Sequence, residues 1–279
     1  MSLKGKTVAL TGGAAGIGAA VRETLLTWGA EVVVLDRTDP QDERVKFIAV
    51  DLSDPDSIEN AIAQLPTELD GLANVAGVPG TQSPELVMRV NYLGLRALTE
   101  HVIDRIRSGG AVVNVASIAG ASWMLHLEKL AELVTIEDYD TALKWSVANA
   151  PARGADAYEF SKEAVLYYTK WRSHSAWQKG VRMNAVCPGA TATGILEDFK
   201  ESMAPGAIDW SEQLLGRHGK PEDVAPIVVF LLDSVSGFIN GADIPVDGGL
   251  VAGLTVGAIS QVEQPSHRSP KSRTGVDDF

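Results

Sequence analysis

The chain has few of the features that mark disulfide-stabilised, membrane-spanning or metal-binding proteins. Its single cysteine, Cys187, excludes an internal disulfide, fits a reducing cytoplasm, and lies in an apolar run typical of a buried, inert thiol. The longest uncharged apolar stretch covers residues 224–232, contains a proline, and is too short to span a bilayer. Because the 5 histidines are scattered without ligand spacing, we predict no metal site.

Basic charge is also scarce, since the formal net charge of the 279 residues is −12. A chain this acidic is repelled by phosphate backbones and anionic lipid, so we expect neither a nucleic-acid nor a membrane partner. The first residues lead directly into a strand pattern without the apolar region of a secretory signal. Together with the lone cysteine, this predicts a cytoplasmic protein.

Short apolar runs rich in Val, Ile and Ala alternate with helical patterns along most of the chain. Continuous apolar strands separated by helices are typical of a parallel sheet that helices cover on both faces. We therefore predict one α/β domain over residues 1–255, a Rossmann-type doubly wound parallel sheet of about seven strands. The expected strands are 7–11, 31–35, 46–50, 71–75, 111–117, 181–186 and 241–246, and the expected helices 17–28, 54–65, 83–108, 158–178 and 221–232.

Two segments depart from this alternation. Residues 120–157 have no strand signal, and their apolar residues recur at near-helical spacing, which predicts one or two inserted helices. Residues 260–279 are polar and without periodicity, so we expect a mobile tail. The apolar residues of the inserted segment are Leu127, Leu130, Val134, Tyr139, Leu143 and Val147.

A glycine-rich loop follows the first strand and opens the first helix. Its three spaced glycines, Gly12, Gly16 and Gly18, allow a sharp turn, close approach of a pyrophosphate, and tight packing of the helix on the sheet. The helix N-terminus supplies N–H groups and a positive dipole end for phosphates. A plain glycine turn is the alternative, but the strand before, the helix after and the acid described next favour a dinucleotide site.

That acid is Asp36, at the end of the second strand. A carboxylate there accepts hydrogen bonds from the adenosine ribose and repels a 2′-phosphate, which predicts NAD over NADP, although the adjacent Arg37 would weaken that preference. The alternative is an aspartate that only caps the strand end. Further polar positions follow the third and fourth strands, at the sheet edge where such folds bind ligands: Asp51, Leu52, Asn74, Ala76 and Gly77.

Tyr158 and Lys162 stand one helical turn apart, so their side chains share a helix face. A phenol has an ordinary pKa near 10, and a nearby ammonium together with a cofactor charge is expected to bring the pKa to roughly 7. Tyr-x-x-x-Lys also arises readily by chance. The pair therefore gains meaning only from the other motifs.

In their order along the chain, these motifs resemble those of the classical short-chain dehydrogenases/reductases over about residues 5–250. The matching elements are Thr11-Gly-x-x-x-Gly-Ile-Gly18, Asp51-Leu52, Asn74-Val-Ala-Gly77, Asn91, Ser117, Tyr158-x-x-x-Lys162 and Pro188-Gly189.

The resemblance implies a role for each matching position. Tyr158 would be the general acid/base, Lys162 would lower its pKa and bind the nicotinamide ribose, and Ser117 would polarise the substrate oxygen. Asn91 would hold a helix distortion and a water of a proton relay. The implied cofactor contacts also include Ile17 in the glycine loop and a nicotinamide loop with Pro188, Gly189, Thr191 and Thr193.

The sequence departs from the family pattern at Phe160, where a small residue is usual, and in the long stretch between Ser117 and Tyr158. That insertion and the segments 74–80 and 239–249 resemble the subgroup containing bacterial coniferyl-alcohol dehydrogenase and 3α-hydroxysteroid dehydrogenase/carbonyl reductase, and we favour the coniferyl-alcohol type. Inserted helices would cover the surface through which many members form four-helix interfaces. We therefore expect a homodimer or another homo-oligomer built differently.

The substrate loop of this fold would span residues 190–219. Its apolar residues suit a bulky aromatic, terpenoid or steroid-like alcohol, ketone or aldehyde. Trp123 and Met124 could line the same pocket, whereas His126 fits a surface or supporting position better than a catalytic one. The expected lid residues are Ile195, Leu196, Phe199, Met203, Trp210, Leu214 and Leu215.

The sequence thus favours an NAD-dependent alcohol dehydrogenase or carbonyl reductase. One alternative is an NADP-dependent reductase of other carbonyls, which Asp36 opposes. The other is a non-catalytic nucleotide-binding scaffold, which would not need the set Asn91, Ser117, Tyr158 and Lys162.

Overall fold

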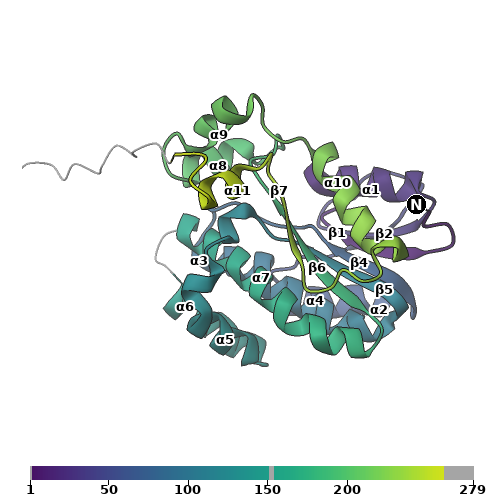
Figure 1. Ribbon diagram of the computed structural model, residues 1–279. Coiled ribbons are helices and arrows are strands. Elements are labelled where there is room, and N and C mark those ends of the chain that lie inside the picture. Colours follow the sequence, from purple (N-terminus) through teal and green to yellow (C-terminus); the bar gives the residue numbers. More distant parts are fainter. Residues whose placement is uncertain (1, 151–153, 261–279) are drawn as a thin grey trace, which may run out of the picture.

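A seven-stranded sheet forms the middle layer of the protein, in the order β3-β2-β1-β4-β5-β6-β7 (Figure 1). All neighbouring strands pair in parallel. The computed structural model describes residues 2–150 and 154–260. The strands are β1 (Thr7–Thr11), β2 (Glu31–Asp36), β3 (Lys46–Ala49), β4 (Leu69–Asn74), β5 (Ile106–Val115), β6 (Arg182–Pro188) and β7 (Asp243–Val246). The predicted doubly wound parallel sheet is confirmed.

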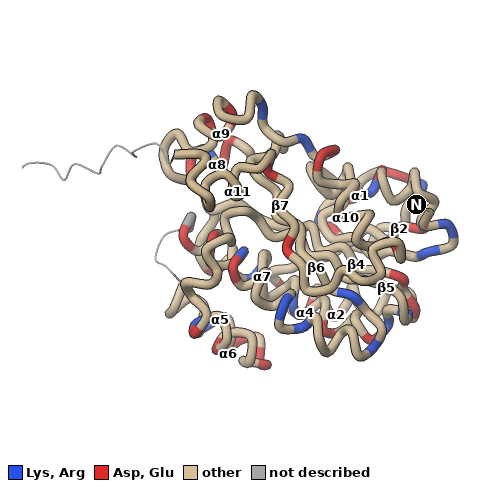
Figure 2. Tube along the Cα trace, in the orientation of Figure 1, with Lys and Arg blue, Asp and Glu red and all other residues tan. Residues whose placement is uncertain are grey.

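Helices cover both faces of the sheet because alternate strand residues point to opposite sides. Val8 and Leu10 pack with α1 (Gly16–Thr27) and α10 (Pro221–Leu232). Ala9, between them, belongs to the core beneath α2 (Pro55–Gln64), α4 (Leu95–Val102) and α7 (Gly154–Gln178). Figure 2 shows the charged residues mainly along the helices and connecting loops.

Two predicted boundaries were wrong. The helical segment expected to reach residue 108 ends at Arg105, and β5 begins at Ile106, which pairs with Leu69 of β4 before a shift in register. The glycine-containing start of β5 has no apolar run to signal a strand. Helix α7 begins at Gly154 rather than at Tyr158, with Asp156 in its first turn, where a carboxylate complements the helix dipole.

The helix that carries Asn91 is distorted, as the sequence implied. A π-helical segment, Arg89–Gly94, separates α3 (Pro84–Met88) from α4. An added Cβ at Gly94 would lie 2.1 Å from the Leu52 carbonyl oxygen. The close approach at Gly94 brings this helix against the loop after β3.

The segment 120–157 contains two inserted helices, α5 (Leu127–Thr135) and α6 (Tyr139–Asn149), which confirms that expectation. Helix α5 packs on α7, and α6 packs on α3, so the insertion covers these two helices (Figure 1). The apolar face was only partly as predicted, because Leu127 and Val147 are exposed. The buried residues are Leu130, Leu133, Val134, Ala142 and Leu143.

Three short helices near the carboxyl ends of the strands were not predicted: α8 (Leu196–Ser202), α9 (Ala207–Leu215) and α11 (Leu250–Thr255) (Figure 1). They lie together on one side of the molecule. Of the expected tail, residues 261–279 lie outside the described residues. In the part of the chain that the structure describes, no helix is both long and apolar enough to cross a membrane.

The turn from β1 into α1 depends on glycines for space. Gly12 has φ of 72°, and an added Cβ would lie 2.7 Å from the Ala76 Cα. An added Cβ at Gly18 would lie 1.9 Å from the Gly12 carbonyl oxygen, closer than real Cβ contacts come. Thr11 secures the same place, because its hydroxyl oxygen accepts hydrogen bonds from the Val75 and Ala76 N–H groups.

We expect Gly18→Ala to destabilise this turn because the new methyl group collides with backbone rather than with a flexible side chain. The overpacking should cost about 1–3 kcal/mol of unfolding free energy. Denaturant unfolding measures it, with the exposed Thr27→Ala at the far end of α1 as the matched control. Equal stability of the two variants would contradict this account of the turn.

Candidate active site

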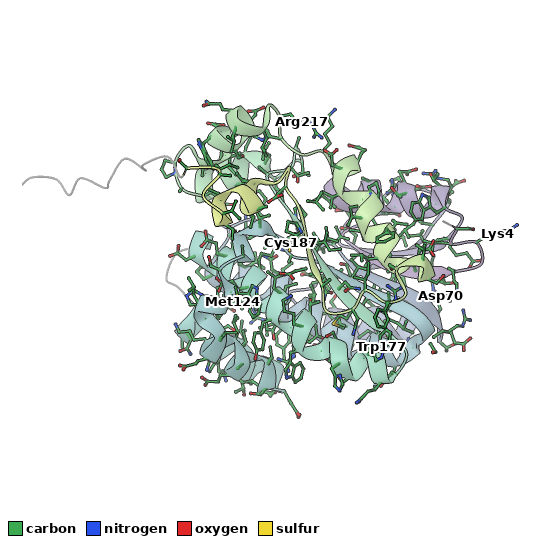
Figure 3. The ribbon with its side chains drawn as sticks, viewed as in Figure 1. Lys4, Asp70, Met124, Trp177, Cys187 and Arg217 are labelled. Atoms are coloured by element: carbon green, nitrogen blue, oxygen red, sulfur yellow. The ribbon has the colours of Figure 1, made fainter. Side chains whose placement is uncertain are left out.

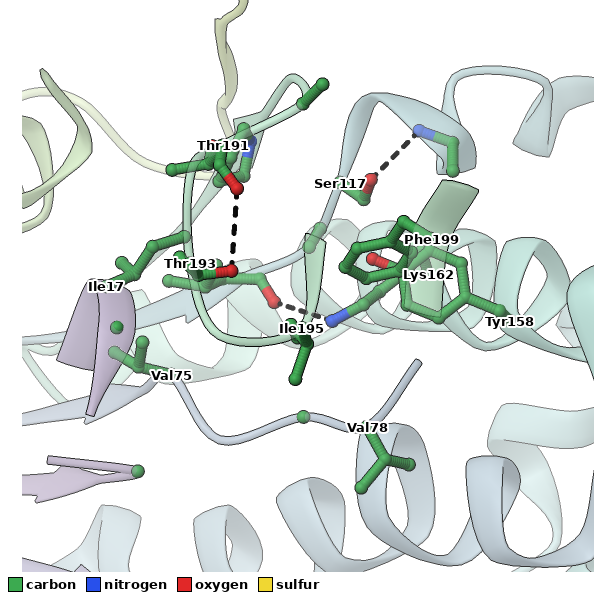
Figure 4. Close-up of a pocket in the computed structure, with 18 of the residues that line it drawn as sticks. Ile17, Val75, Val78, Ser117, Tyr158, Lys162, Thr191, Thr193, Ile195 and Phe199 are labelled. Carbon is green, nitrogen blue, oxygen red and sulfur yellow. Dashed lines mark hydrogen bonds between the residues drawn. The ribbon is translucent and has the colours of Figure 1, made fainter. Parts of the chain in front are cut away.

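A cavity of about 930 Å³ lies at the carboxyl ends of the strands. It is next to the neighbouring strands β1 and β4, where the strand order reverses: β2 and β3 follow on one side of this pair, and β5 to β7 on the other. It gathers sixteen of the eighteen predicted site residues, although they come from distant parts of the chain (Figure 4). These are Gly12, Gly16, Ile17, Gly18, Asp36, Asp51, Leu52, Ala76, Gly77, Ser117, Tyr158, Lys162, Pro188, Gly189, Thr191 and Thr193.

At one end of the cavity, Asp36 supports the glycine loop. Its carboxylate accepts a hydrogen bond of 3.0 Å from the Ala14 N–H and another of 3.0 Å from the Thr38 N–H. Arg37 and Thr38 also line this end of the cavity, a contribution that sequence reasoning did not assign to Thr38. Asp36 therefore lines the cavity and also holds the glycine loop and the residues after β2 in place through these two hydrogen bonds.

Asp51 lies beside the same end of the cavity and is held as a carboxylate. Burial raises the pKa of Asp51, but hydrogen bonds from the Ser53 hydroxyl and N–H and the charge of Arg37 outweigh it. The pKa is therefore below its usual range. Arg37 lines the same cavity.

At the other end, Tyr158 is 7% exposed, and its phenol faces the Ser117 hydroxyl. Burial raises the pKa of Tyr158 to about 12, and the nearby Ser117 hydroxyl opposes that rise. The Ser117 oxygen also accepts a hydrogen bond of 3.1 Å from the Ala119 N–H at the start of a 3-10 turn. Ser117 is thereby fixed in orientation just beyond the end of β5.

Lys162 extends from the same face of α7 as Tyr158, as the spacing predicted. Its Nζ lies 5.6 Å from the Tyr158 ring centroid and donates a hydrogen bond of 3.2 Å to the Val115 carbonyl oxygen (Figure 4). Burial lowers the pKa of Lys162 to about 8. Burial dominates the pKa of Tyr158, and the Lys162 ammonium lies beside the ring and the Val115 carbonyl, so the predicted lowering by this ammonium together with a cofactor charge stays a prediction.

Asn91 and Asn74 do not line the cavity. The Asn91 side chain accepts a hydrogen bond from the Val78 N–H at 2.8 Å and donates to the Val78 carbonyl at 3.1 Å and to the Ser161 hydroxyl at 3.2 Å. It thus joins the π-helical segment to the loop after β4 and to α7.

Asn74 is buried at the end of β4. Its amide donates hydrogen bonds to Thr99 in α4 at 2.9 Å and to Asn114 in β5 at 2.8 Å. These contacts hold neighbouring elements together, so its predicted direct contact with a cofactor has no counterpart in the geometry of the cavity.

The segment 190–219 contributes only some of the expected lid residues. Leu196 is buried away from the cavity, Leu214 is exposed, and Leu215 lies in the space beside Gly248. The helix α11 closes the same side of the cavity and was missed, although the apolar run after Gly248 and Gly249 was its available signal. The expected lid residues that do line the cavity are Ile195, Phe199, Met203 and Trp210. Helix α11 adds Leu250, Val251, Leu254 and Thr255.

The residues suggested at the start of the insertion lie elsewhere. Trp123 packs edge-on against Tyr167, and Met124 is 63% exposed on the outer side of the insertion (Figure 3). His126 holds the Glu163 carboxylate at 2.7 Å, so it supports α7 rather than lining the cavity. Of residues 121–126, only Ala121 and Ser122 line the cavity.

Two further features limit the chemistry. Burial raises the pKa of the Cys187 thiol to about 12, so the interior thiol, labelled in Figure 3, is an inert group, as expected. Across residues 2–150 and 154–260, no cluster of His, Cys, Asp and Glu side chains is arranged to hold a metal.

The cavity fits a dinucleotide from end to end. A Cβ at Gly12 or Gly18 would fill the turn that lets backbone N–H groups at the start of α1 face a pyrophosphate. Asp36 and Asp51 line the cavity together with Arg37 and Thr38, and Thr193 lies against the glycine loop, where an added Cβ at Gly16 would be 3.3 Å from its Cγ2. Such a cofactor would supply hydride transfer next to a phenol and a hydroxyl.

Two family models match consecutive parts of the chain, "short chain dehydrogenase" over residues 6–128 and "Enoyl-(Acyl carrier protein) reductase" over residues 141–251. A coniferyl-alcohol dehydrogenase of Pseudomonas sp. strain HR199 is 38% identical, over 90% of this chain and 99% of that protein. A 3-alpha-hydroxysteroid dehydrogenase/carbonyl reductase of Comamonas testosteroni is 30% identical, over 88% of this chain and 96% of that protein.

A solved structure agrees with these relatives. The 3-alpha-hydroxysteroid dehydrogenase from Pseudomonas sp. B-0831, complexed with NADH, superimposes with a TM-score of 0.76 at 32% identity, covering 91% of this chain and 100% of that one. The motifs, the parallel sheet and the near-complete coverage agree, and the chain belongs to the short-chain dehydrogenase/reductase family of oxidoreductases.

Proposed function

We propose that the protein is an NAD-dependent dehydrogenase that moves hydride between nicotinamide and a bulky apolar alcohol, or the corresponding ketone or aldehyde. The observation that carries this proposal is the meeting of Ser117, Tyr158 and Lys162 at one end of a cavity whose other end has the glycine loop and Asp36. A protein that only bound the nucleotide would need the end with the glycine loop and Asp36, but not the group of Ser117, Tyr158 and Lys162. The nicotinamide, when bound, accepts or supplies the hydride.

The residues of the chain would move the proton and hold the substrate. In alcohol oxidation the Tyr158 phenolate accepts the hydroxyl proton, and in carbonyl reduction the phenol returns it. The Ser117 hydroxyl, already fixed by its bond to the Ala119 N–H, donates to the developing alkoxide. Lys162 binds the nicotinamide ribose and adds positive charge, and Asn91 orders a water that exchanges the proton with solvent.

The remaining predicted contacts belong to cofactor binding. Gly12, Gly16, Ile17 and Gly18 would hold the pyrophosphate, and Asp36 the adenosine ribose. Asp51, Leu52, Ala76 and Gly77 would border the adenosine half, and Pro188, Gly189, Thr191 and Thr193 the nicotinamide half. We assign Asn74 the supporting role of holding β4, β5 and α4 in register.

The substrate end of the cavity is walled mainly by apolar side chains, which supports a bulky apolar substrate over a small polar one. The names of two relatives, a coniferyl-alcohol dehydrogenase and a 3-alpha-hydroxysteroid dehydrogenase, fit the aromatic and steroid-like ends of that range. The apolar walls are Ile118, Phe199, Met203, Trp210 and Leu254.

Use of NADP is the second candidate, because Arg37 lines the adenosine end and lies close enough to Asp51 to affect its pKa. A guanidinium there could pair with a 2′-phosphate. We favour NAD because the Asp36 carboxylate, fixed by two backbone N–H groups, would repel that phosphate.

Tyr158→Phe tests the reaction. Loss of the proton-transfer group should lower kcat by about 100- to 10,000-fold while leaving thermal unfolding unchanged. Because burial raises the phenol pKa to about 12, the proton is retained at neutral pH. Wild-type oxidation should therefore rise with pH, whereas reduction, which needs the phenol, should stay level until high pH. A variant with near-normal turnover and the same pH profiles would refute the assignment.

Asp36→Asn tests the cofactor preference, since it removes the charge and keeps an oxygen acceptor for the loop. Removing a like charge about 4 Å from a phosphate is worth about 1–4 kcal/mol, so the kcat/KM ratio of NADP to NAD should rise by about tenfold or more. Asp39→Asn, an exposed change outside the cavity, is the control. A ratio unchanged by Asp36→Asn would place the preference elsewhere.

We also propose that the protein is cytoplasmic, as its single cysteine suggests. We further propose that it is a homodimer, because α5 and α6 pack over α7 and α3, the surface that the usual four-helix interface would need. Light scattering coupled to size exclusion should therefore give a particle of two chains. The ordinary tetramer would contradict this proposal.

A further inference from the structure

Phe199, on the short helix α8, lies directly against the candidate catalytic tyrosine. Its ring centroid is 5.0 Å from that of Tyr158, with an interplanar angle of 62° (Figure 4). The two rings form a small cluster with Val87, Ala119 and Ala157, and Val78 joins this cluster to one of the main cores. Phe199 also lines the cavity, so one ring contacts both the proton-transfer group and the space that the substrate would enter.

A single hydrogen bond ties α8 to the opposite wall of the cavity. The Thr81 hydroxyl, in the loop after β4, donates to the Asp198 carboxylate at 3.2 Å. Within the described part of the chain, no other hydrogen bond joins α8 to that wall. The turn that presents Thr81 is closed by the Gln82 N–H, which donates to the Pro79 carbonyl oxygen.

The remaining polar contacts of α8 stay on its own side of the cavity. Lys200 pairs with Glu197 at 3.1 Å and with Asp209 of α9 at 3.6 Å, and the two acids are largely exposed. Exposed pairs of this kind contribute little to a fixed position. Besides the buried Leu196, the Thr81–Asp198 bond and the Phe199–Tyr158 contact are therefore the interactions that hold α8 across the cavity.

This placement constrains the substrate. An oxygen that reaches both Ser117 and Tyr158 brings its neighbouring carbons beside the Phe199 ring. Aromatic rings favour edge-to-face or offset-stacked partners and gain energy beyond the area they bury. A flat conjugated group next to the reacting carbon meets that preference, whereas a flexible alkyl chain gains only the apolar contact.

We propose that Phe199 is a specificity-determining residue that selects substrates whose reacting carbon is attached to a flat conjugated aromatic group, and that the Thr81–Asp198 hydrogen bond holds Phe199 in place. The inference rests on the proposed dehydrogenase function and adds to it the residue that chooses the substrate. It also gives α8 a defined task, although Phe199 is the only one of the α8 residues that lines the cavity.

The kinetic test compares cinnamyl alcohol with nonan-1-ol, which has the same carbon count but no ring. Phe199→Ala removes the apolar contact for both alcohols, but it should lower kcat/KM for cinnamyl alcohol by a further factor of about 2 to 12 relative to nonan-1-ol, the size of an aromatic pair. Phe199→Leu should restore the bulk but not the ring preference. Leu214→Ala, exposed on α9 and outside the cavity lining, should change neither value.

The hydrogen bond is tested without turnover, through tryptic cleavage after Lys200 within α8, followed by mass spectrometry. Thr81→Val and Asp198→Ala should each speed cleavage about three- to tenfold, whereas Asp198→Asn, which keeps the acceptor, should cleave at nearly the wild-type rate. Thr141→Val removes a similar Thr–Asp bond, to Asp138 in the insertion, and should leave Lys200 cleavage unchanged.

The two arms separate the possible failures. If wild-type protein oxidises no alcohol in a panel of aromatic, terpenoid and steroid alcohols, the proposed function fails, while the cleavage rates still report on α8. If turnover is normal and Phe199→Ala lowers kcat/KM equally for both alcohols, the selectivity role is overturned. Wild-type cleavage rates in Thr81→Val and Asp198→Ala would overturn the role of the hydrogen bond.

Discussion

Parallel pairing of all seven strands is the constraint on which the rest of the structure depends. It brings every carboxyl end to one edge of the sheet, so Gly12, Asp36, Ser117 and Pro188, from four different strands or the residues just after them, meet around one cavity. Parallel strands also require crossover helices, which bury the sheet on both faces. A rigid edge and a buried sheet are thus two results of the same pairing.

Features written into short stretches of sequence could be predicted, and those set by distant contacts could not. The apolar strands and the glycine turn at Gly12 were predictable because each has a local physical cause. The early start of β5 depends on pairing between Ile106 and Leu69, which no local pattern reveals. Likewise, Leu214 and Trp210 are both apolar residues of α9, yet only Trp210 faces the cavity.

The Tyr158–Lys162 pair shows the same limit for electrostatics. Spacing placed both side chains on one helix face, but burial raises the phenol pKa to about 12 and lowers the ammonium pKa to about 8. Both shifts favour the neutral forms, because desolvation penalises charge of either sign. A site built in this way holds its proton at rest, and only an added positive charge beside the phenol would favour release. The spacing therefore indicates where the proposed proton transfer would occur, whereas the surroundings decide the protonation state from which it starts.

Proton transfer and substrate choice depend on different parts of the chain. Ser117 and Tyr158 are fixed by the sheet edge and by α7, which lie in the buried core. Phe199 belongs to a short helix attached by one hydrogen bond across the cavity and by exposed ion pairs on its own side. Changes in such a helix cost little core packing, so the wall that meets the substrate can vary while the proton-transfer groups stay in place.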